Sequence, residues 1–308
     1  ATHVSYEKYL EYMKEYNQDF TLLQESVLKE VSEYTKTRFS IIILSLKKII
    51  ETNKEFTELL LLISLMDSQD IPRNLLDKYN KDIITDNLIF NLNKYSLITR
   101  QSSLNKILTF SIHRSTQEIS LAYFINALNL KEDSPLLHKI GNVLEEYSAD
   151  IVDKEDFISM KGLISHCETF LNHDYFLSTD IKSIISTELG GIYFHLSDYI
   201  KAQNILTNCQ ETLKHYHLYP QLAKSLIYLG NTLRKLGDYE KAKSCMENGI
   251  KVNEHHLPQE KFRLSWAFVQ LANVYKALGK YKNAISLFEK GIQLQKKYFP
   301  QNYIFIAW

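Results

Sequence analysis

Two pairs of histidines are the residues of this chain that could most readily bind a metal ion. His215 and His217 form one pair, and His255 and His256 form the other. Neither pair has a carboxylate or a thiol at the spacing of a zinc ligand set. We therefore expect no metal site, and we interpret both pairs as solvated helix ends.

Candidates for a catalytic nucleophile are equally scarce. The three cysteines are scattered along the chain, which fits neither a disulfide framework nor a zinc site. No Ser/His/Asp or Cys/His set has the flanking motif of a catalytic nucleophile. The phosphate-binding pattern Gly-x-x-x-x-Gly-Lys-Ser/Thr is also absent, so these residues alone are not expected to hydrolyse ATP. We expect a non-enzymatic chain without a cofactor of its own.

The composition narrows the class of partner. Among 308 residues, 36 basic and 36 acidic side chains cancel, which argues against bulk binding to nucleic acid or to an acidic membrane. With 45% hydrophobic residues but only 9 Gly and 5 Pro, helices joined by short turns are favoured. No signal peptide or apolar run of spanning length is apparent. We expect a cytoplasmic protein, in a bacterium or, for a secreted effector, in a host cell.

An internal repeat dominates the second half of the chain. Three segments align without gaps, beginning at Leu189, Leu229 and Leu271. The separation between the second and third segments, 42 residues, recurs outside these segments. It separates Gly249 from Gly291, Pro258 from Pro300, and Trp266 from Trp308. Agreement of several residue types on one interval predicts a true structural repeat.

Each repeat has the pattern of two helices joined by a tight turn. In the third, apolar residues recur at helical spacing from Leu271 to Leu278, and Gly279 then predicts the end of the helix. Small residues at Ala202, Ala242 and Ala284 predict a close approach of the paired helices. Such hairpins bury their apolar faces only by stacking, so we expect an α-solenoid.

These residues resemble the tetratricopeptide repeat (TPR), and the long interval is similar to the variety found in kinesin light chains. The resemblance covers residues 181–308, with Ser197 and Ala272 replacing glycines of the pattern. Residues 131–180 are expected to be degenerate linking or capping helices. Because Trp308 aligns with Trp266 inside a first helix, we expect the array to continue beyond this chain.

The first helix of each repeat supplies the candidate binding surface. Helical spacing places seven residues on its expected concave side: Ile227, Asn231, Arg234, Lys235, Val269, Asn273 and Lys276. The resemblance to TPR domains implies that the asparagines bind the backbone of a protein or peptide ligand and that the basic residues attract its acidic groups. The alternative is that all seven are solvated inner-face residues.

Residues 1–130 lack the repeat and predict a separate, mainly helical domain with a small β-hairpin. Phe56 to Met66 is apolar on nearly all sides, as in a buried central helix, and Asp70-Ile71-Pro72 is expected to start a second helix with proline in its first turn. Leu97–Ile98 and Ile107–Phe110 flank a polar turn and predict the hairpin. Three helices followed by a hairpin have the layout of a winged helix. DNA binding is disfavoured, because residues 83–92 contain no Arg or Lys.

This region resembles the winged helix at the C-terminal end of the NB-ARC module in STAND NTPases. The resemblance implies that His113 contacts the β-phosphate of bound ADP, although Arg114 stands where the family often has an acid. It also implies that the phosphate-binding half precedes Ala1, so ADP or ATP would bind only to a longer protein. The alternative for His113 is a strand-end histidine bonded to a backbone carbonyl.

Two functional hypotheses remain open from the sequence. In the first, the chain is the regulatory portion of a STAND-type NTPase, whose repeats bind a signal and whose winged helix couples binding to nucleotide state. Self-association on activation would accompany that role. In the second, the chain is a passive TPR scaffold or adaptor, or a bacterial effector that binds host proteins, without any nucleotide.

Overall fold

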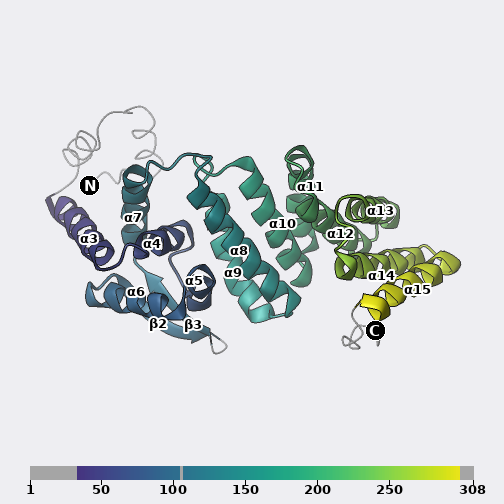
Figure 1. The fold of residues 1–308 in the computed structure, drawn as a ribbon, viewed down its shortest axis with the longest axis horizontal. Coiled ribbons are helices and arrows are strands. Elements are labelled where there is room, and N and C mark those ends of the chain that lie inside the picture. Colours follow the sequence, from purple (N-terminus) through teal and green to yellow (C-terminus); the bar gives the residue numbers. More distant parts are fainter. Residues whose placement is uncertain (1–32, 105–106, 299–308) are drawn as a thin grey trace. The chain divides into compact units, whose positions relative to one another are not determined.

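The computed structural model describes residues 33–104 and 107–298, which are mainly helical with one small sheet (Figure 1). Pro300 and Trp308, two residues of the predicted repeat, lie outside the described ranges. The chain forms two compact units, one of Ala1–Val143 with Glu168–Phe176 and one of Leu144–Cys167 with Leu177–Trp308. The region expected to link the domains, residues 131–180, is thus divided between both units.

The first unit is built around a buried helix. Its helices are α3 (Glu33–Thr52), α4 (Phe56–Leu65), α5 (Arg73–Tyr79), α6 (Asp82–Lys94) and α7 (Arg114–Ala127). Helix α4 is buried on almost every side, including Phe56, Leu59 and Leu61, which confirms the predicted central helix. In α7, the side-chain amide of Gln117 donates to the backbone oxygens of Ile63 and Met66 and so fixes α7 against the end of α4.

A three-stranded antiparallel sheet completes the first unit. Its strands are β1 (Ile71–Pro72), β2 (Ile98–Leu104) and β3 (Ile107–Ile112), in the order β1-β3-β2. The predicted hairpin is therefore confirmed as β2 and β3. The second helix was predicted to start too early, because Ile71 and Pro72 form a strand that pairs with Phe110 and Thr109, so α5 begins at Arg73.

The second unit is a series of helix hairpins. It contains the C-terminal part of α8 (Pro135–Asp153), most of α9 (Phe157–Leu171), and then three pairs: α10 (Thr179–His195) with α11 (Tyr199–His215), α12 (Tyr219–Lys235) with α13 (Tyr239–His256), and α14 (Lys261–Ala277) with α15 (Tyr281–Tyr298). Each helix of a pair packs against the other and against the next pair. The predicted α-solenoid is confirmed.

The turns inside the three pairs share one backbone conformation. Gly237 and Gly279 end α12 and α14 at φ +88° and +72°, and Ser197 takes the equivalent place after α10 at φ +65°. A left-handed residue is needed there to reverse the chain, and glycine adopts it without steric cost. Ser197 adopts it at the expense of some strain.

Small residues allow the paired helices to approach closely. A Cβ added to Gly230 would lie 2.5 Å from Cγ of Met246 and 3.1 Å from the backbone oxygen of Ala242. Ala202 and Ala242 are completely buried, in agreement with the predicted close approach.

In the part of the chain that the structure describes, no helix is both long enough and apolar enough to cross a membrane.

Candidate functional site: a charged pocket on the first helices of the repeats

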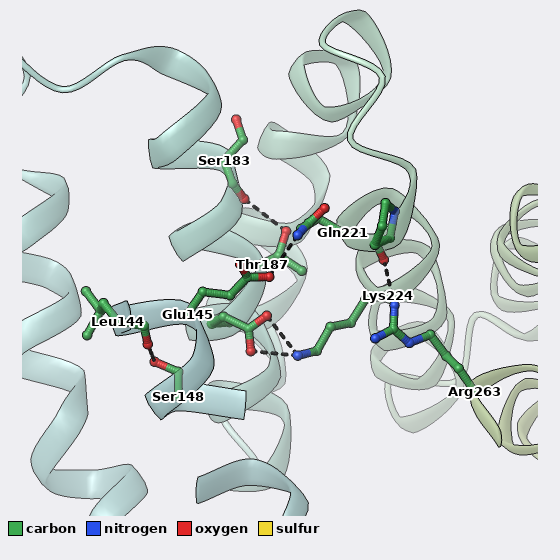
Figure 2. A network of polar contacts seen from close by, with 10 residues as sticks. Leu144, Glu145, Ser148, Ser183, Thr187, Gln221, Lys224 and Arg263 are labelled. Carbon is green, nitrogen blue, oxygen red and sulfur yellow. Dashed lines mark hydrogen bonds and ion pairs between the residues drawn. The ribbon is translucent and has the colours of Figure 1, made fainter. Parts of the chain in front are cut away.

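A buried ion pair links the first helices of two successive hairpins. Lys224 in α12 donates from Nζ to both carboxylate oxygens of Glu188 in α10, at 2.8 and 2.7 Å (Figure 2). The side chains are only 18% and 1% exposed, respectively. A charge this deeply buried is stable only when it is paired, so each group depends on the other.

Burial and pairing act differently on the two partners. Loss of hydration raises the pKa of Glu188, although the ammonium of Lys224 opposes this shift. Burial by itself lowers the pKa of Lys224, but the charge and hydrogen bond of Glu188, together with Tyr228, more than offset it, so the pKa is raised. Lys224 therefore stays protonated, and its ammonium group is held beside the Glu188 carboxylate.

An open pocket of about 190 Å³ lies beside this pair. It is lined by Glu145, Glu146, Ala149, Pro220, Gln221, Lys224 and Arg263. The side-chain amide of Gln221 donates to Oε1 of Glu145 at 2.8 Å, and Nη1 of Arg263 donates to the backbone oxygen of Pro220 at 3.3 Å. The close view shows Glu145 of α8, Gln221 and Lys224 of α12, and Arg263 of α14 (Figure 2).

The solenoid positions these side chains by stacking. Helices α8, α12 and α14 supply the lining, and α10 supplies the carboxylate below it. These four are the alternate helices of the series, each the first of its pair. Side chains of α8 and α12 hydrogen-bond to each other although α10 and α11 lie between them in sequence. The pocket therefore lies on the side of the stack where first helices converge.

The structure separates the seven predicted groove residues into two groups. Ile227 and Asn231 are completely buried, and Val269 is partly buried, whereas Lys235 and Lys276 are exposed. A Cβ added to Gly249 or Gly291 would lie 3.0 Å from Ile227 or Val269, so these two face the second helix of their own pair.

The two predicted asparagines also differ. Both side-chain polar atoms of Asn231 are buried without a hydrogen-bond partner among the residues that the structure describes, whereas Asn273 is partly exposed. Arg234 is half-buried, and burial lowers the pKa of its guanidinium, with Tyr199 and Tyr239 opposing the shift. Asn273, Arg234 and the two lysines are thus the predicted residues that a ligand could reach in this conformation.

His113 lies directly after β3 and before α7. Its Nδ1 accepts a hydrogen bond from the backbone N–H of Ser115 at 3.2 Å and lies 2.9 Å from the Ser115 hydroxyl. The side chain is exposed and caps the N-terminus of α7.

The histidine pairs pack around an aromatic ring. Tyr219 stacks on His256 with ring centroids 3.5 Å apart, and the Tyr219 hydroxyl lies 2.9 Å from Nδ1 of His217. Burial lowers the pKa of His256, and nearby His255 and His217 add to the shift. Within the described ranges, no three His, Cys, Asp or Glu side chains are placed to hold a metal ion.

The pocket residues were not predicted from the sequence, although a signal exists. The repeat intervals align Glu188 with Tyr228 and Gln270, and they align Lys224 with Ile184 and Trp266. Oppositely charged residues therefore interrupt otherwise uncharged positions of neighbouring repeats. The pocket is therefore indicated by Glu188 and Lys224, which depart from the repeat, rather than by the recurrent asparagines.

Comparison with known families identifies the repeats. Two tetratricopeptide-repeat models match, one at residues 183–254 and one at residues 267–298. The chain therefore contains tetratricopeptide repeats, a class of α-solenoid that binds other proteins, and neither matched model describes a catalytic domain. No curated protein matches the chain.

Several solved structures are similar to this chain at low sequence identity. A kinesin light chain repeat protein of Podosopora anserina is 16% identical, with a TM-score of 0.42, over 60% of this chain and 88% of that one. A Rap protein complexed with Competence and Sporulation Factor is 14% identical, with a TM-score of 0.42, over 71% and 56%. A STAND protein with a TPR sensor from Pyrococcus horikoshii is 16% identical, with a TM-score of 0.26, over 91% and 53%.

Proposed function

We propose that this chain is the non-catalytic, protein-interaction and regulatory portion of a STAND-type signalling NTPase. The solenoid binds a protein or peptide signal, and the first unit couples that binding to the nucleotide state of a preceding domain. The observation that carries the proposal is that one helix, α8, has residues in both units.

The contacts of α8 are specific at both ends. Within the first unit, Nζ of Lys139 donates to Glu58 at 2.6 Å and lies 4.3 Å from the ring centroid of Tyr79. Within the second unit, Glu145 accepts from Gln221 and lines the charged pocket. Glu145 follows Lys139 by six residues in the same helix, and the proposal is that displacement of Glu145 by a ligand alters the contacts of Lys139.

The order of elements in the first unit supports its role as a winged helix. A helix, a short strand, two helices and two further strands follow one another as α4, β1, α5, α6, β2 and β3. The short strand β1 pairs with β3, which makes the sheet three-stranded. In this proposal His113, directly after β3, senses ADP bound by the upstream part of the longer protein.

The second candidate is a passive TPR scaffold or adaptor, or a bacterial effector. It is favoured by the N-cap role of His113, because a capping residue explains the position of that side chain without any nucleotide. A phosphate-binding loop encoded upstream of Ala1 supports the NTPase, whereas an upstream sequence without one supports the adaptor.

Two substitutions of His113 in the longer protein separate these functions. Asparagine retains an N-cap acceptor but removes the imidazole, whereas alanine removes both. The regulatory proposal predicts that His113→Ala and His113→Asn both lose retention of ADP, measured by the nucleotide content of the purified protein. Retention of ADP by both variants would contradict the sensor role, and loss by His113→Ala alone would assign the effect to the helix cap.

A further inference from the structure

Internal pairing leaves three charged groups of the pocket available. The charges of Glu188 and Lys224 cancel within their ion pair. One carboxylate oxygen of Glu145 accepts a hydrogen bond from Gln221. Glu146, which also lines the pocket, has no hydrogen-bonding or ion-pair partner among the described residues. Arg263 donates to a backbone oxygen and forms no ion pair with a carboxylate in the described part of the chain, although its charge opposes the rise in the pKa of Glu188. Two carboxylates of α8 and a guanidinium of α14 thus line the same pocket.

We propose that this pocket recognises an extended peptide segment carrying one basic and one acidic side chain close together. The inference rests on the proposed function of the solenoid as a peptide-binding surface. Glu145 and Glu146 receive the basic side chain, and Arg263 forms a bidentate pair with the acidic one. The ordering of opposite charges across the helices fixes the direction in which the peptide lies.

The size of the pocket fits this occupant. At about 190 Å³ it is smaller than the roughly 300–1,000 Å³ of typical small-molecule sites. It therefore accommodates individual side chains of a longer ligand better than a whole cofactor. The groups that line it are also fixed in place, because the buried Glu188–Lys224 pair and the Gln221–Glu145 bond tie α8, α10 and α12 together.

The test uses the full 308-residue chain and a phage-displayed library of random dodecapeptides. We expect selected peptides to be enriched in an acidic and a basic residue a few positions apart. For a selected peptide, Arg263→Gln and Glu146→Gln should each raise Kd about tenfold, as expected for the loss of one charged contact. The matched controls Lys282→Gln and Glu289→Gln, exposed on α15, should leave Kd unchanged.

Exchange of the charges of Arg263 and its peptide partner provides a second test, in which a gain of binding cannot be explained by unfolding of the variant. Arg263→Glu should abolish binding of the original peptide but restore it for a peptide whose acidic residue is replaced by lysine. Restored binding supports the proposal, and failure of the exchanged pair to bind while the variant remains folded by circular dichroism contradicts it.

The remaining outcomes distinguish this inference from the proposed function. If peptides bind but depend on Asn273 and Lys276 rather than on Arg263 and Glu146, the pocket assignment is wrong while the solenoid remains a binding surface. If the library yields no peptide, or only peptides insensitive to substitution on any first helix, both the pocket assignment and the peptide-binding function are wrong.

Discussion

The two units of this molecule use polar side chains in opposite ways. In the first unit each polar contact occurs once, as in the hydrogen bonds of Tyr79 and Lys139 to Glu58. In the second unit the same small residues and turns recur from pair to pair, and a buried ion pair, Glu188 with Lys224, stands where the repeat is broken. The repeated residues form the scaffold, and the residues that depart from the repeat mark the candidate site.

The largest expected effect comes from breaking the buried pair of the second unit. Lys224→Met leaves Glu188 buried without its cation, and removal of one partner of such a pair costs about 3–5 kcal/mol. We expect this loss in the free energy of unfolding, measured with urea. The double variant Glu188→Leu/Lys224→Met should recover most of it. Equal destabilisation in the single and double variants would show that packing, not the unpaired charge, determines the loss.

A pH-dependent effect is expected in the first unit. Burial lowers the pKa of His173 to about 4, so the folded state resists protonation that the unfolded chain accepts near pH 6.5. Stability supplied by neutral His173 is therefore complete above pH 6.5 and is lost as the pH falls toward 4, by up to about 3 kcal/mol.

Replacement of His173 by glutamine isolates this contribution. The variant should show a smaller fall in unfolding free energy between pH 7 and pH 4 than the unsubstituted chain. Identical pH profiles of the two proteins would exclude His173 as the titrating group.

A smaller effect is expected from the hydrogen bond between Tyr79 and Glu58 in the first unit. The Tyr79 hydroxyl donates to Oε2 of Glu58 at 2.5 Å, and burial, together with this bond, raises the pKa of the phenol. Because Glu58 is partly exposed, Tyr79→Phe should cost only about 1 kcal/mol of unfolding free energy. Tyr95→Phe serves as the control in the same unit, and an equal loss in both variants would argue against a specific role for the bond.

The smallest expected effect compares equivalent turns of the second unit. Ser197→Gly should stabilise the chain by about 0.5–1 kcal/mol, and Gly237→Ser should destabilise it by a similar amount, because both positions have positive φ. Thermal unfolding of the two variants provides the measurement. Shifts of the same sign would contradict the equivalence of these turns.

The sequence predicts the second unit better than the first for a physical reason. Glycines at the turns and alanines at the helix contacts satisfy local requirements, which the recurrence at Gly237 and Gly279 makes visible. The strand β1 could not be predicted, because a two-residue strand exists only through its pairing with β3. A local pattern contains no information on such a contact.

The candidate site was only partly predictable for the same reason. Helical spacing placed residues on the first helices, where the pocket does lie, but it could not distinguish Ile227, which faces Gly249, from Lys224, which reaches Glu188. That distinction depends on the superhelical stacking of α8, α10, α12 and α14. Only the three-dimensional arrangement brings Arg263 and Glu145 to one pocket.

Hydrogen–deuterium exchange of the full chain, with and without a selected peptide, tests the central claim most directly. The account predicts slower exchange in α8, α10, α12 and α14 on binding, accompanied by a change in α4 and α5, which α8 contacts through Lys139. Protection confined to α11, α13 and α15, or no protection of the first helices, would contradict it.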